Sequence, residues 1–311
     1  MILNTGSRTD IPAYFSRWFF NRVADESVLV RNPYNPHRVT SYQIDPAVVD
    51  LITFCTKNPA PMLDRLDELS AFDTFWHVTI TPYGKDIEPF VPPVSETLDS
   101  FRKLSAVIGK NRVVWRYDPV VLTERYDVRC HIRAFESMSA ALEGWTDQCV
   151  VSFLDLYEKT KRNFPEAASV GMDDQERLID AFTESAERHG LQIHLCCENS
   201  ALVRKRVDAD GCFSQKVIED ALGSRLIVPK HKEARPICRC LLGSDIGAYN
   251  TCGHGCRYCY ANYDRKTVKR NLSLHNPDSA LLIGHLKPDD IVTQADQKSW
   301  KDRRIRMEDL L

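Results

Sequence analysis

The sequence lacks any apolar run approaching the 18 residues or more that a membrane-spanning helix needs. Its N-terminal segment lacks the basic flank and apolar stretch of a secretory signal peptide. Lysine and arginine (41 residues) nearly balance aspartate and glutamate (43 residues), so no excess of one charge indicates a polyanionic partner. No internal repeat or low-complexity tract is present. These absences favour a cytoplasmic protein with no membrane partner.

The composition is that of an ordinary globular protein, because 43% of the 311 residues are hydrophobic and 27% are charged. A chain of this length fits two domains, or one large α/β barrel with an appendage. We expect a division into residues 1–200, a barrel-like domain, and residues 201–311, a cysteine-rich segment packed on it.

Short apolar runs alternate with segments of helical period in the first 200 residues. The expected strands are residues 2–4, 51–55, 75–80, 112–115, 149–153 and 191–196. The expected helices between them include residues 61–69, 95–108, 132–142 and 173–189. This rhythm predicts an α/β fold with about six parallel strands, arranged as an incomplete (β/α) barrel. A doubly wound sheet is the alternative, and residues 32–44 are expected to form an inserted loop or hairpin.

Eleven cysteines are the main clue to function, and five of them lie between Cys238 and Cys259. Their number is odd, and a chain of this size does not depend on disulfides for its stability. Metal binding or catalysis is therefore favoured over disulfide bonding.

Cys252, Cys256 and Cys259 form a C-x3-C-x2-C array. Thiolates are soft ligands that suit zinc or iron–sulfur clusters. Three cysteines do not complete a tetrahedral zinc site, whereas a loop around a cubane delivers three thiolates to three irons at this spacing. Gly253 and Gly255 permit the tight turns that such a loop needs.

The array resembles the signature of radical S-adenosylmethionine (SAM) enzymes, and the segment GAYNTCGHGCRYCYAN is similar to the branch that contains spore photoproduct lyase. Tyr258 occupies the place of the aromatic residue that precedes the third cysteine, next to the cofactor. The resemblance implies a [4Fe–4S] cluster whose open iron binds SAM, and a one-electron reductant such as flavodoxin or ferredoxin. In such enzymes the signature usually follows the first strand, whereas here it follows the sixth expected strand.

The chain as a whole resembles the DUF1848 family, described by a C-terminal cysteine cluster similar to that of radical SAM enzymes. The resemblance rests on five segments of the sequence: SRTDIP (7–12), TKNP (56–59), WRYDP (115–119), SFLDLY (152–157) and DIG (245–247). It implies the fold and the cluster and brings no established reaction or substrate.

Four further cysteines suggest a second cluster or a zinc site: Cys197, Cys212, Cys238 and Cys240. The alternative is that they are small buried hydrophobic residues. Cys238 or Cys240 could instead complete the ligand set of the first cluster and block SAM. Cys55, Cys130, Cys149 and Cys196 lie in strand or helix patterns and are expected to be core residues.

Polar residues follow the expected strands, at the end where (β/α) proteins build their active sites. The candidate catalytic residues are Arg8, Asp10, Lys57, Asn58, Arg116, Asp118 and Asp155. Arginine and aspartate recur at two strand ends, a pattern suited to anionic substrate groups or the SAM carboxylate. A structural network of salt bridges is the alternative, and residues 57–59 could also form a helix-start turn. His254 is either a loop spacer or a ligand.

The leading hypothesis is a radical SAM-like iron–sulfur enzyme acting on an unknown substrate. The alternatives are an iron–sulfur redox or sensing protein that does not use SAM, and a zinc-stabilised module that binds nucleic acid. The basic stretch 298–306 favours a solvent-exposed terminal helix over a nucleic-acid contact.

Overall fold

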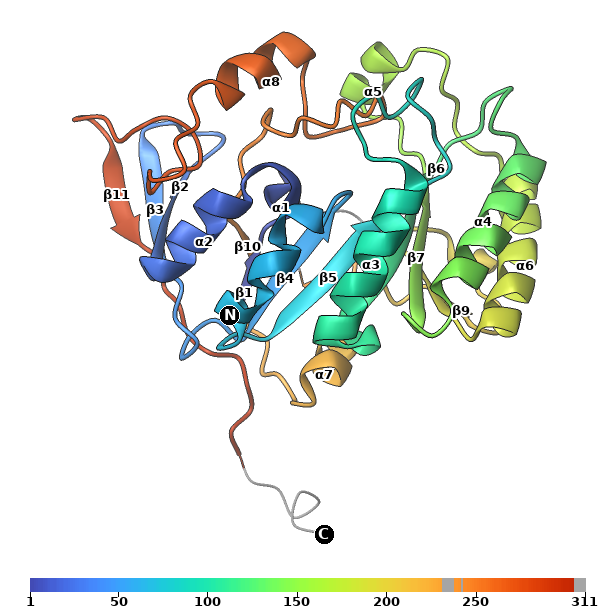
Figure 1. Ribbon diagram of the computed structural model, residues 1–311, viewed down its shortest axis with the longest axis horizontal. Coiled ribbons are helices and arrows are strands. Elements are labelled where there is room, and N and C mark those ends of the chain that lie inside the picture. The colour runs from blue at the N-terminus through green and yellow to red at the C-terminus, as the bar shows by residue number, and fades with distance from the viewer. Residues whose placement is uncertain (231–237, 242, 305–311) are drawn as a thin grey trace.

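Eight parallel strands form the main sheet of the computed structural model, which describes residues 1–230, 238–241 and 243–304 (Figure 1). Their spatial order is β10-β1-β4-β5-β6-β7-β8-β9. In chain order the strands are β1 (Ile2–Asn4), β4 (Leu51–Thr56), β5 (Thr74–Thr79), β6 (Val113–Val120), β7 (Gln148–Phe153), β8 (Gln192–Leu195), β9 (Val207–Asp208) and β10 (Ser244–Asp245). The α/β class predicted from the sequence is confirmed.

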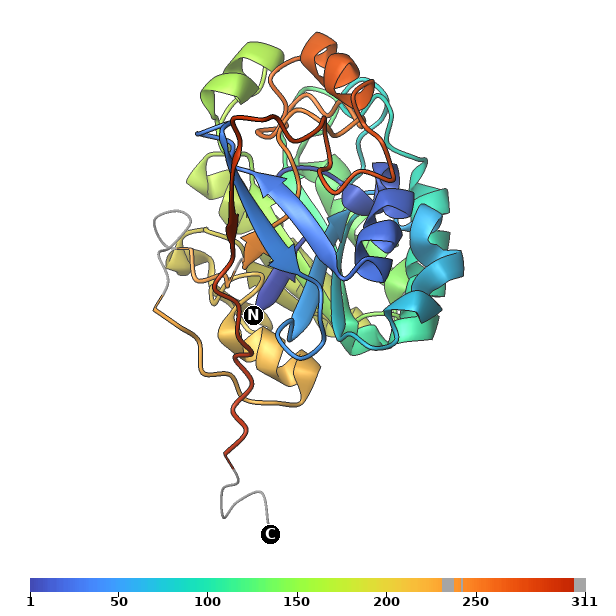
Figure 2. The ribbon, with the colours of Figure 1, turned by 90° about the vertical axis from the view of Figure 1, so that its left-hand side faces the viewer.

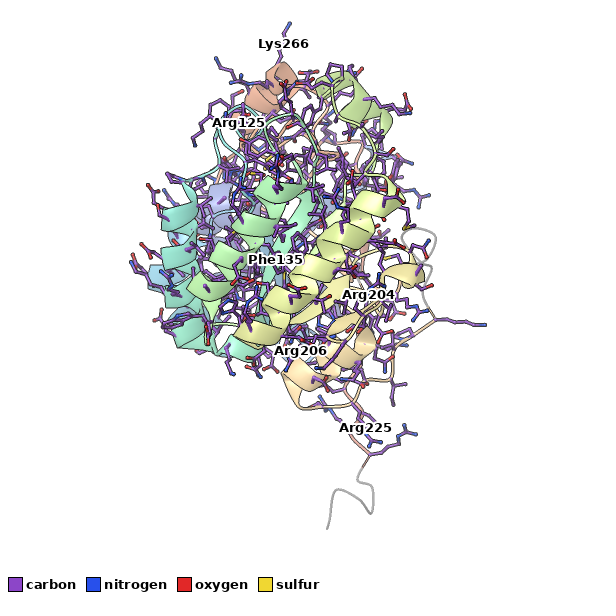
Figure 3. The ribbon with its side chains drawn as sticks, turned by 90° about the vertical axis from the view of Figure 1, so that its right-hand side faces the viewer. Arg125, Phe135, Arg204, Arg206, Arg225 and Lys266 are labelled. Carbon is purple, nitrogen blue, oxygen red and sulfur yellow. The ribbon has the colours of Figure 1, made fainter. Side chains whose placement is uncertain are left out.

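The connecting helices cover one face of the sheet. They are α1 (Ile11–Tyr14), α2 (Ser16–Ala24), the 3-10 helix η1 (Ala60–Leu69), α3 (Val94–Ile108), α4 (Val128–Leu142) and α6 (Met172–His189). Strand order advances in one direction from β1 to β9, so right-handed crossovers place these helices on the same face. Figure 3 shows α4 and α6 side by side, where Phe135 stacks on Phe182 with ring centroids 4.0 Å apart.

The doubly wound alternative is wrong, because that topology requires the strand order to reverse. The six expected strands correspond to β1 and β4 to β8, and the sheet gains β9 and β10 from the C-terminal segment. Within the described residues β9 and β10 do not pair with each other, so closure into a barrel is not seen.

The second face of the sheet changes from apolar to polar along the strands. At the amino half it carries five apolar residues: Ile2, Leu51, Phe75, Val114 and Val150. Helix α7 (Gln215–Leu222) packs against them through buried Val217 and Ile218. At the carboxyl half the same face carries polar or thiol side chains: Thr53, Cys55, His77, Thr79, Arg116 and Ser152. The carboxyl half of this face is therefore polar, and the amino half is apolar and packed against α7.

A second, three-stranded sheet flanks the molecule. Residues 32–44, expected as a loop or hairpin, supply the turn and second strand of a hairpin whose first strand precedes them. In it β2 (Ser27–Arg31) pairs with β3 (Arg38–Gln43), and β11 (Ile291–Gln294) adds in parallel to β3. Figure 2 shows the C-terminal segment beside this hairpin. Residues 298–304 contain no helix, so the expected terminal helix is wrong for this stretch, and residues 305–306 lie outside the described part.

The remaining elements are α5 (Glu158–Asn163), α8 (Arg265–Leu272) and two short 3-10 helices, η2 (Lys110–Arg112) and η3 (Ser200–Leu202). Helices α5 and α8 lie beyond the carboxyl ends of the strands (Figure 1). Helix α6 begins at Met172 with Gly171 as its N-cap, so the sequence placed its start one residue late. Among the described helices, none is both long and apolar enough to cross a membrane.

Candidate functional site

A cavity of about 1540 Å³ opens at the carboxyl edge of the main sheet. Six of the seven strand-end candidates line it: Arg8, Asp10, Lys57, Arg116, Asp118 and Asp155. The signature residues Cys252, Cys256, Tyr258 and Cys259 line the same cavity, as do Cys212, Cys238 and Cys240. Asn58 and Cys197 are not among its lining residues. The sheet and the C-terminal segment thus meet in one place, whereas the functional roles of these residues remain predictions.

The signature loop approaches its surroundings closely at both glycines. A Cβ atom on Gly253 would lie 2.6 Å from the Tyr14 ring, and Gly255 has a φ of +69°. A larger residue at 253 would clash, and one at 255 would be strained. The loop is also held by main-chain hydrogen bonds from Phe90 N to His254 O and from Arg257 N to Ile87 O. Its conformation is therefore fixed by the fold.

Asp10 ties the first two strand ends to the signature loop. One carboxylate oxygen, Oδ1, accepts hydrogen bonds from Thr56 Oγ1 at 2.7 Å and Ala13 N at 3.0 Å. The other, Oδ2, accepts from Lys57 N and His254 Nε2, both at 2.8 Å. The Nδ1 atom of His254 then accepts from the Tyr14 hydroxyl at 3.1 Å. His254 is buried, and it anchors the loop rather than merely spacing the cysteines.

Lys57 and Tyr258 meet at a buried glutamate. Lys57 Nζ lies 2.9 Å from Glu88 Oε1, which also accepts hydrogen bonds from Thr81 Oγ1 at 2.8 Å and from the Tyr258 hydroxyl. Burial lowers the pKa of Lys57, but the neighbouring acidic groups, Glu88 foremost, together outweigh it and hold the pKa above its usual value. Burial raises the pKa of Tyr258, which keeps its hydroxyl as a donor. Glu88 therefore links Tyr258 to Lys57, which follows the carboxyl end of β4.

Two further ion pairs occupy the strand ends. Arg116 pairs with Asp118, which also accepts a hydrogen bond from Ser152 Oγ. Arg8 lies 3.7 Å from Asp245, and its guanidinium is 5.8 Å from the centre of the Tyr249 ring. Asp245 belongs to β10, so Arg8 joins the first strand to the strand that precedes the signature. Both the structural network and an anion site remain compatible with these pairs.

Asn58 has a local role. Its side-chain Oδ1 accepts a hydrogen bond from Ala60 N at 3.2 Å, and its own N–H donates to Thr56 Oγ1 at 2.9 Å. These are the contacts of a turn that starts η1, which was the alternative considered for residues 57–59.

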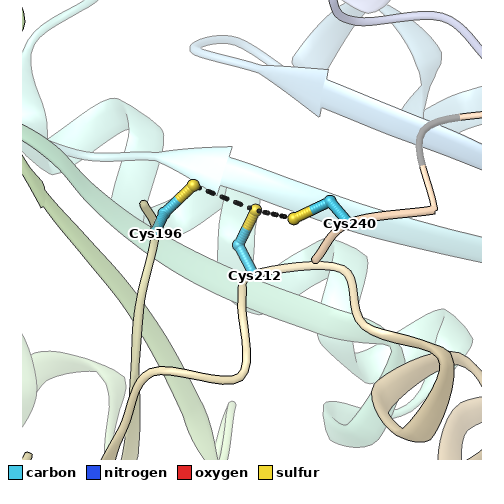
Figure 4. Close-up of side chains that lie close together, drawn as sticks. All are labelled: Cys196, Cys212 and Cys240. Atoms are coloured by element: carbon cyan, nitrogen blue, oxygen red, sulfur yellow. Dashed lines mark hydrogen bonds between the residues drawn. The ribbon is translucent and has the colours of Figure 1, made fainter. Parts of the chain in front are cut away.

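A second group of thiols lies apart from the signature. The Sγ atoms of Cys196, Cys212 and Cys240 all lie within 4.8 Å of one another, and all three residues are buried (Figure 4). This cysteine triad could hold a metal ion. Cys196 is buried in the core as expected, and its thiol also lies 3.4 Å from that of Cys212.

Three residues of the cavity region were missed by sequence reasoning. Glu88 lies in a loop between β5 and α3 and had no signal. His77 and Cys196 were read as parts of apolar strands, although His77 shares a face with Phe75 and Thr79 under a two-residue period. Following each face of a strand separately would have separated the polar positions from the packed ones.

The signature cysteines are half-buried, with the carboxylates of Asp10 and Glu88 nearby. Burial, then the nearby carboxylate of Asp10, raises the pKa of Cys252, and burial with Glu88 does the same for Cys256. Burial also raises the pKa of Cys259. Holding all three as thiolates therefore requires a compensating positive charge, which a metal centre supplies.

The fold and this cavity define a class: an α/β protein with a thiol-rich pocket at the carboxyl edge of a parallel sheet. The chain belongs to the family described as a domain of unknown function, DUF1848, whose model matches residues 2–261. That span includes the main sheet and all three signature cysteines. No curated protein and no solved structure matches the chain.

Proposed function

We propose that this protein is an iron–sulfur enzyme of the radical SAM type, in which Cys252, Cys256 and Cys259 hold a [4Fe–4S] cluster. The observation that carries the proposal is the loop bearing these three cysteines, anchored by Asp10 and Glu88 beside a cavity of about 1540 Å³. When bound, such a cluster supplies one electron that breaks a carbon–sulfur bond of SAM, giving methionine and a 5′-deoxyadenosyl radical.

The spacing of the thiols supports a cluster at the signature. Around a single tetrahedral ion with metal–sulfur bonds of about 2.3 Å, the sulfur atoms lie about 3.8 Å apart. In the described chain the signature cysteines do not form a group with all Sγ atoms within 4.8 Å, whereas the other triad does. A wider set of three thiols suits three irons of a cubane better than one zinc ion.

The remaining cysteines support an open fourth iron. Cys240 contacts Cys212 at 3.3 Å and belongs to a separate group of thiols. The alternative in which Cys240 completes the cluster is therefore disfavoured. An iron without a protein thiolate is the position at which SAM binds in the enzymes that the signature resembles.

Arg8 is the cation best suited to the SAM carboxylate. Arg116 and Lys57 are each paired at short range with an acid, half-buried Asp118 and buried Glu88. Arg8 lines the cavity, and its contacts with the Asp245 and Gly247 segment are 3.5–3.7 Å long. A guanidinium pairs with a carboxylate through two parallel hydrogen bonds.

The test is SAM cleavage by anaerobically reconstituted protein reduced with dithionite. Wild-type protein should form 5′-deoxyadenosine and methionine, and a Cys256→Ala variant should form neither. Cys130→Ala is the matched control, because this half-buried thiol lies on α4, away from the cavity.

Two results would overturn the proposal. In the first, iron-loaded wild-type protein gives no product and shows no SAM-induced change in its EPR spectrum. This result would indicate a redox or sensing protein. In the second, the signature binds stoichiometric zinc and no iron, which would exclude the proposed iron–sulfur cluster.

A further inference from the structure

A second cluster of cysteines lies on the cavity wall formed by β8 and the segment around α7. The thiols of Cys196 and Cys212 are 3.4 Å apart, and those of Cys212 and Cys240 are 3.3 Å apart (Figure 4). Cys238 shares hydrogen bonds with Cys240 and Cys197. Cys196, Cys212, Cys238 and Cys240 are each no more than 6% exposed. The thiols of Cys196, Cys212 and Cys240 thus lie within 4.8 Å of one another, and that of Cys238 interacts with Cys240 at the edge of this group.

The main chain fixes the segments that carry these thiols. Cys196 N donates to Val151 O at 3.0 Å, which extends the pairing of β8 with β7. The carbonyl of Cys212 accepts a hydrogen bond from His77 Nε2 at 3.1 Å, and Leu241 N donates to Phe213 O at 2.9 Å. The Cys212 and Cys240 segments are therefore hydrogen-bonded to each other and to the sheet. A site built in this way is preorganised.

The spacing fits a single metal ion. Sulfur atoms around a tetrahedral ion lie about 3.8 Å apart, since the metal–sulfur bond is about 2.3 Å. The observed sulfur–sulfur distances of 3.3 and 3.4 Å, with the triad all within 4.8 Å, are close to this value. Small shifts of side chains about χ1 are enough to admit the ion.

Cys238 is a better fourth ligand than Cys197. Cys238 is buried, lines the cavity with Cys240 and lies two residues from it, so one turn delivers both thiols. Cys197 is only half-buried and does not line the cavity. Four thiolates around a divalent ion carry a net charge of about −2, and the buried Arg116 guanidinium interacts electrostatically with Cys196 and Cys212.

We propose that Cys196, Cys212, Cys238 and Cys240 bind one divalent metal ion, zinc by preference, in a tetrahedral thiolate site separate from the signature. The site fixes β8, the segment before α7 and the segment after residue 237 at one wall of the cavity. It does not depend on the proposed SAM chemistry, because none of its ligands belongs to the signature.

The experiment uses the full chain with Cys252, Cys256 and Cys259 all changed to alanine, so that no signature cluster contributes. We expect about one zinc ion per folded chain by elemental analysis. Replacement of the ion by Co²⁺ should give the visible bands and sulfur-to-cobalt charge-transfer absorption of a tetrahedral thiolate site. A folded but metal-free protein, or one with iron and sulfide in cluster stoichiometry, would overturn the proposal.

Single substitutions in the same background test the ligand set. Cys238→Ser should shift the Co²⁺ charge-transfer bands, because one thiolate is replaced by a weaker oxygen ligand. Cys197→Ser should leave the bands unchanged, and so should Cys149→Ala, which removes a buried thiol in β7 that does not line the cavity. A shift with Cys197→Ser and none with Cys238→Ser would contradict the assignment, and circular dichroism checks that every variant is folded.

Discussion

Asp10 joins three parts of the molecule through four hydrogen bonds, to Ala13, Thr56, Lys57 and His254. A buried carboxylate with this many donors cannot be replaced by a neutral group without leaving a donor unsatisfied. His254 in turn fixes the backbone between the first two signature cysteines. Asp10 is therefore a positioning residue for the proposed cluster.

Asp10→Asn should lower the free energy of unfolding by about 1–3 kcal/mol. The NH2 group that replaces one carboxylate oxygen cannot accept the hydrogen bonds that this oxygen accepts in the wild-type protein. It should also lower the iron content of the reconstituted protein. Asp99→Asn is the control, since Asp99 is exposed and pairs only with Arg102 on the surface of α3, where such pairs contribute about 0–1 kcal/mol. Equal iron content in the two variants would remove the positioning role of Asp10.

His131, a residue of α4, is buried against β6, where it donates to Val121 O at 3.0 Å and accepts from the Tyr117 hydroxyl at 2.7 Å. Burial lowers the pKa of His131, so the folded state stays neutral while the unfolded state takes up a proton below pH 6.5. The stabilising contribution is present above about pH 6.5 and is lost as the pH falls below it.

The protonation of His131 can be followed by ¹⁵N NMR of the imidazole rings. We expect its ring to become protonated only at a pH below that of an unperturbed histidine. His189 should behave oppositely, because the hydrogen bonds that it donates to Glu143 and Glu136 raise the pKa of His189. Protonation of His131 at a higher pH than His189 would contradict both assignments.

Sequence reasoning found the residues that directly follow apolar strands and missed those that arrive from loops. Arg8, Asp10 and Lys57 could be predicted because strand ends converge in parallel sheets. Glu88 could not, because no local pattern in residues 84–91 indicates that the loop folds back under Tyr258. Cys196 was read as a core residue because burial and a ligand role look alike in an apolar strand.

The strands could be predicted, and the division of their second face could not. Apolar runs identified β1 and β4 to β8 because these strands are buried on both faces. β9 and β10 have two residues each, which is too short for any pattern. The role of α7 depends on tertiary contact with the amino half of the sheet, which a helical period alone does not reveal.

Ile218→Ala in α7 tests that packing. Ile218 is fully buried against the second face of the sheet, so its truncation should cost about 2–5 kcal/mol by transfer and cavity formation. Ile227→Ala is the control, because Ile227 is 54% exposed and its loss should change stability by no more than about 0.5 kcal/mol. Chemical denaturation of both variants measures the difference, and equal costs would mean that α7 does not secure this face.

On the scale of the whole molecule, the C-terminal segment completes the sheet at both edges. β9 pairs with β8, and β10 pairs with β1. The signature follows β10, so it emerges beside the carboxyl end of the first strand although it lies late in the sequence. The signature thus lies next to the first strand in space, as in the enzymes that it resembles, although it does not follow that strand in the sequence. The order of the elements in the sequence does not predict that the signature lies beside the first strand.

The proposed function requires a [4Fe–4S] cluster with three cysteine ligands and one iron open to SAM. The most direct measurement is the Mössbauer spectrum of protein reconstituted with ⁵⁷Fe, recorded with and without SAM. We expect the spectrum of a four-iron cluster in which about a quarter of the iron signal changes when SAM is added. A spectrum that is unchanged by SAM, with all four irons equivalent in their ligands, would contradict it.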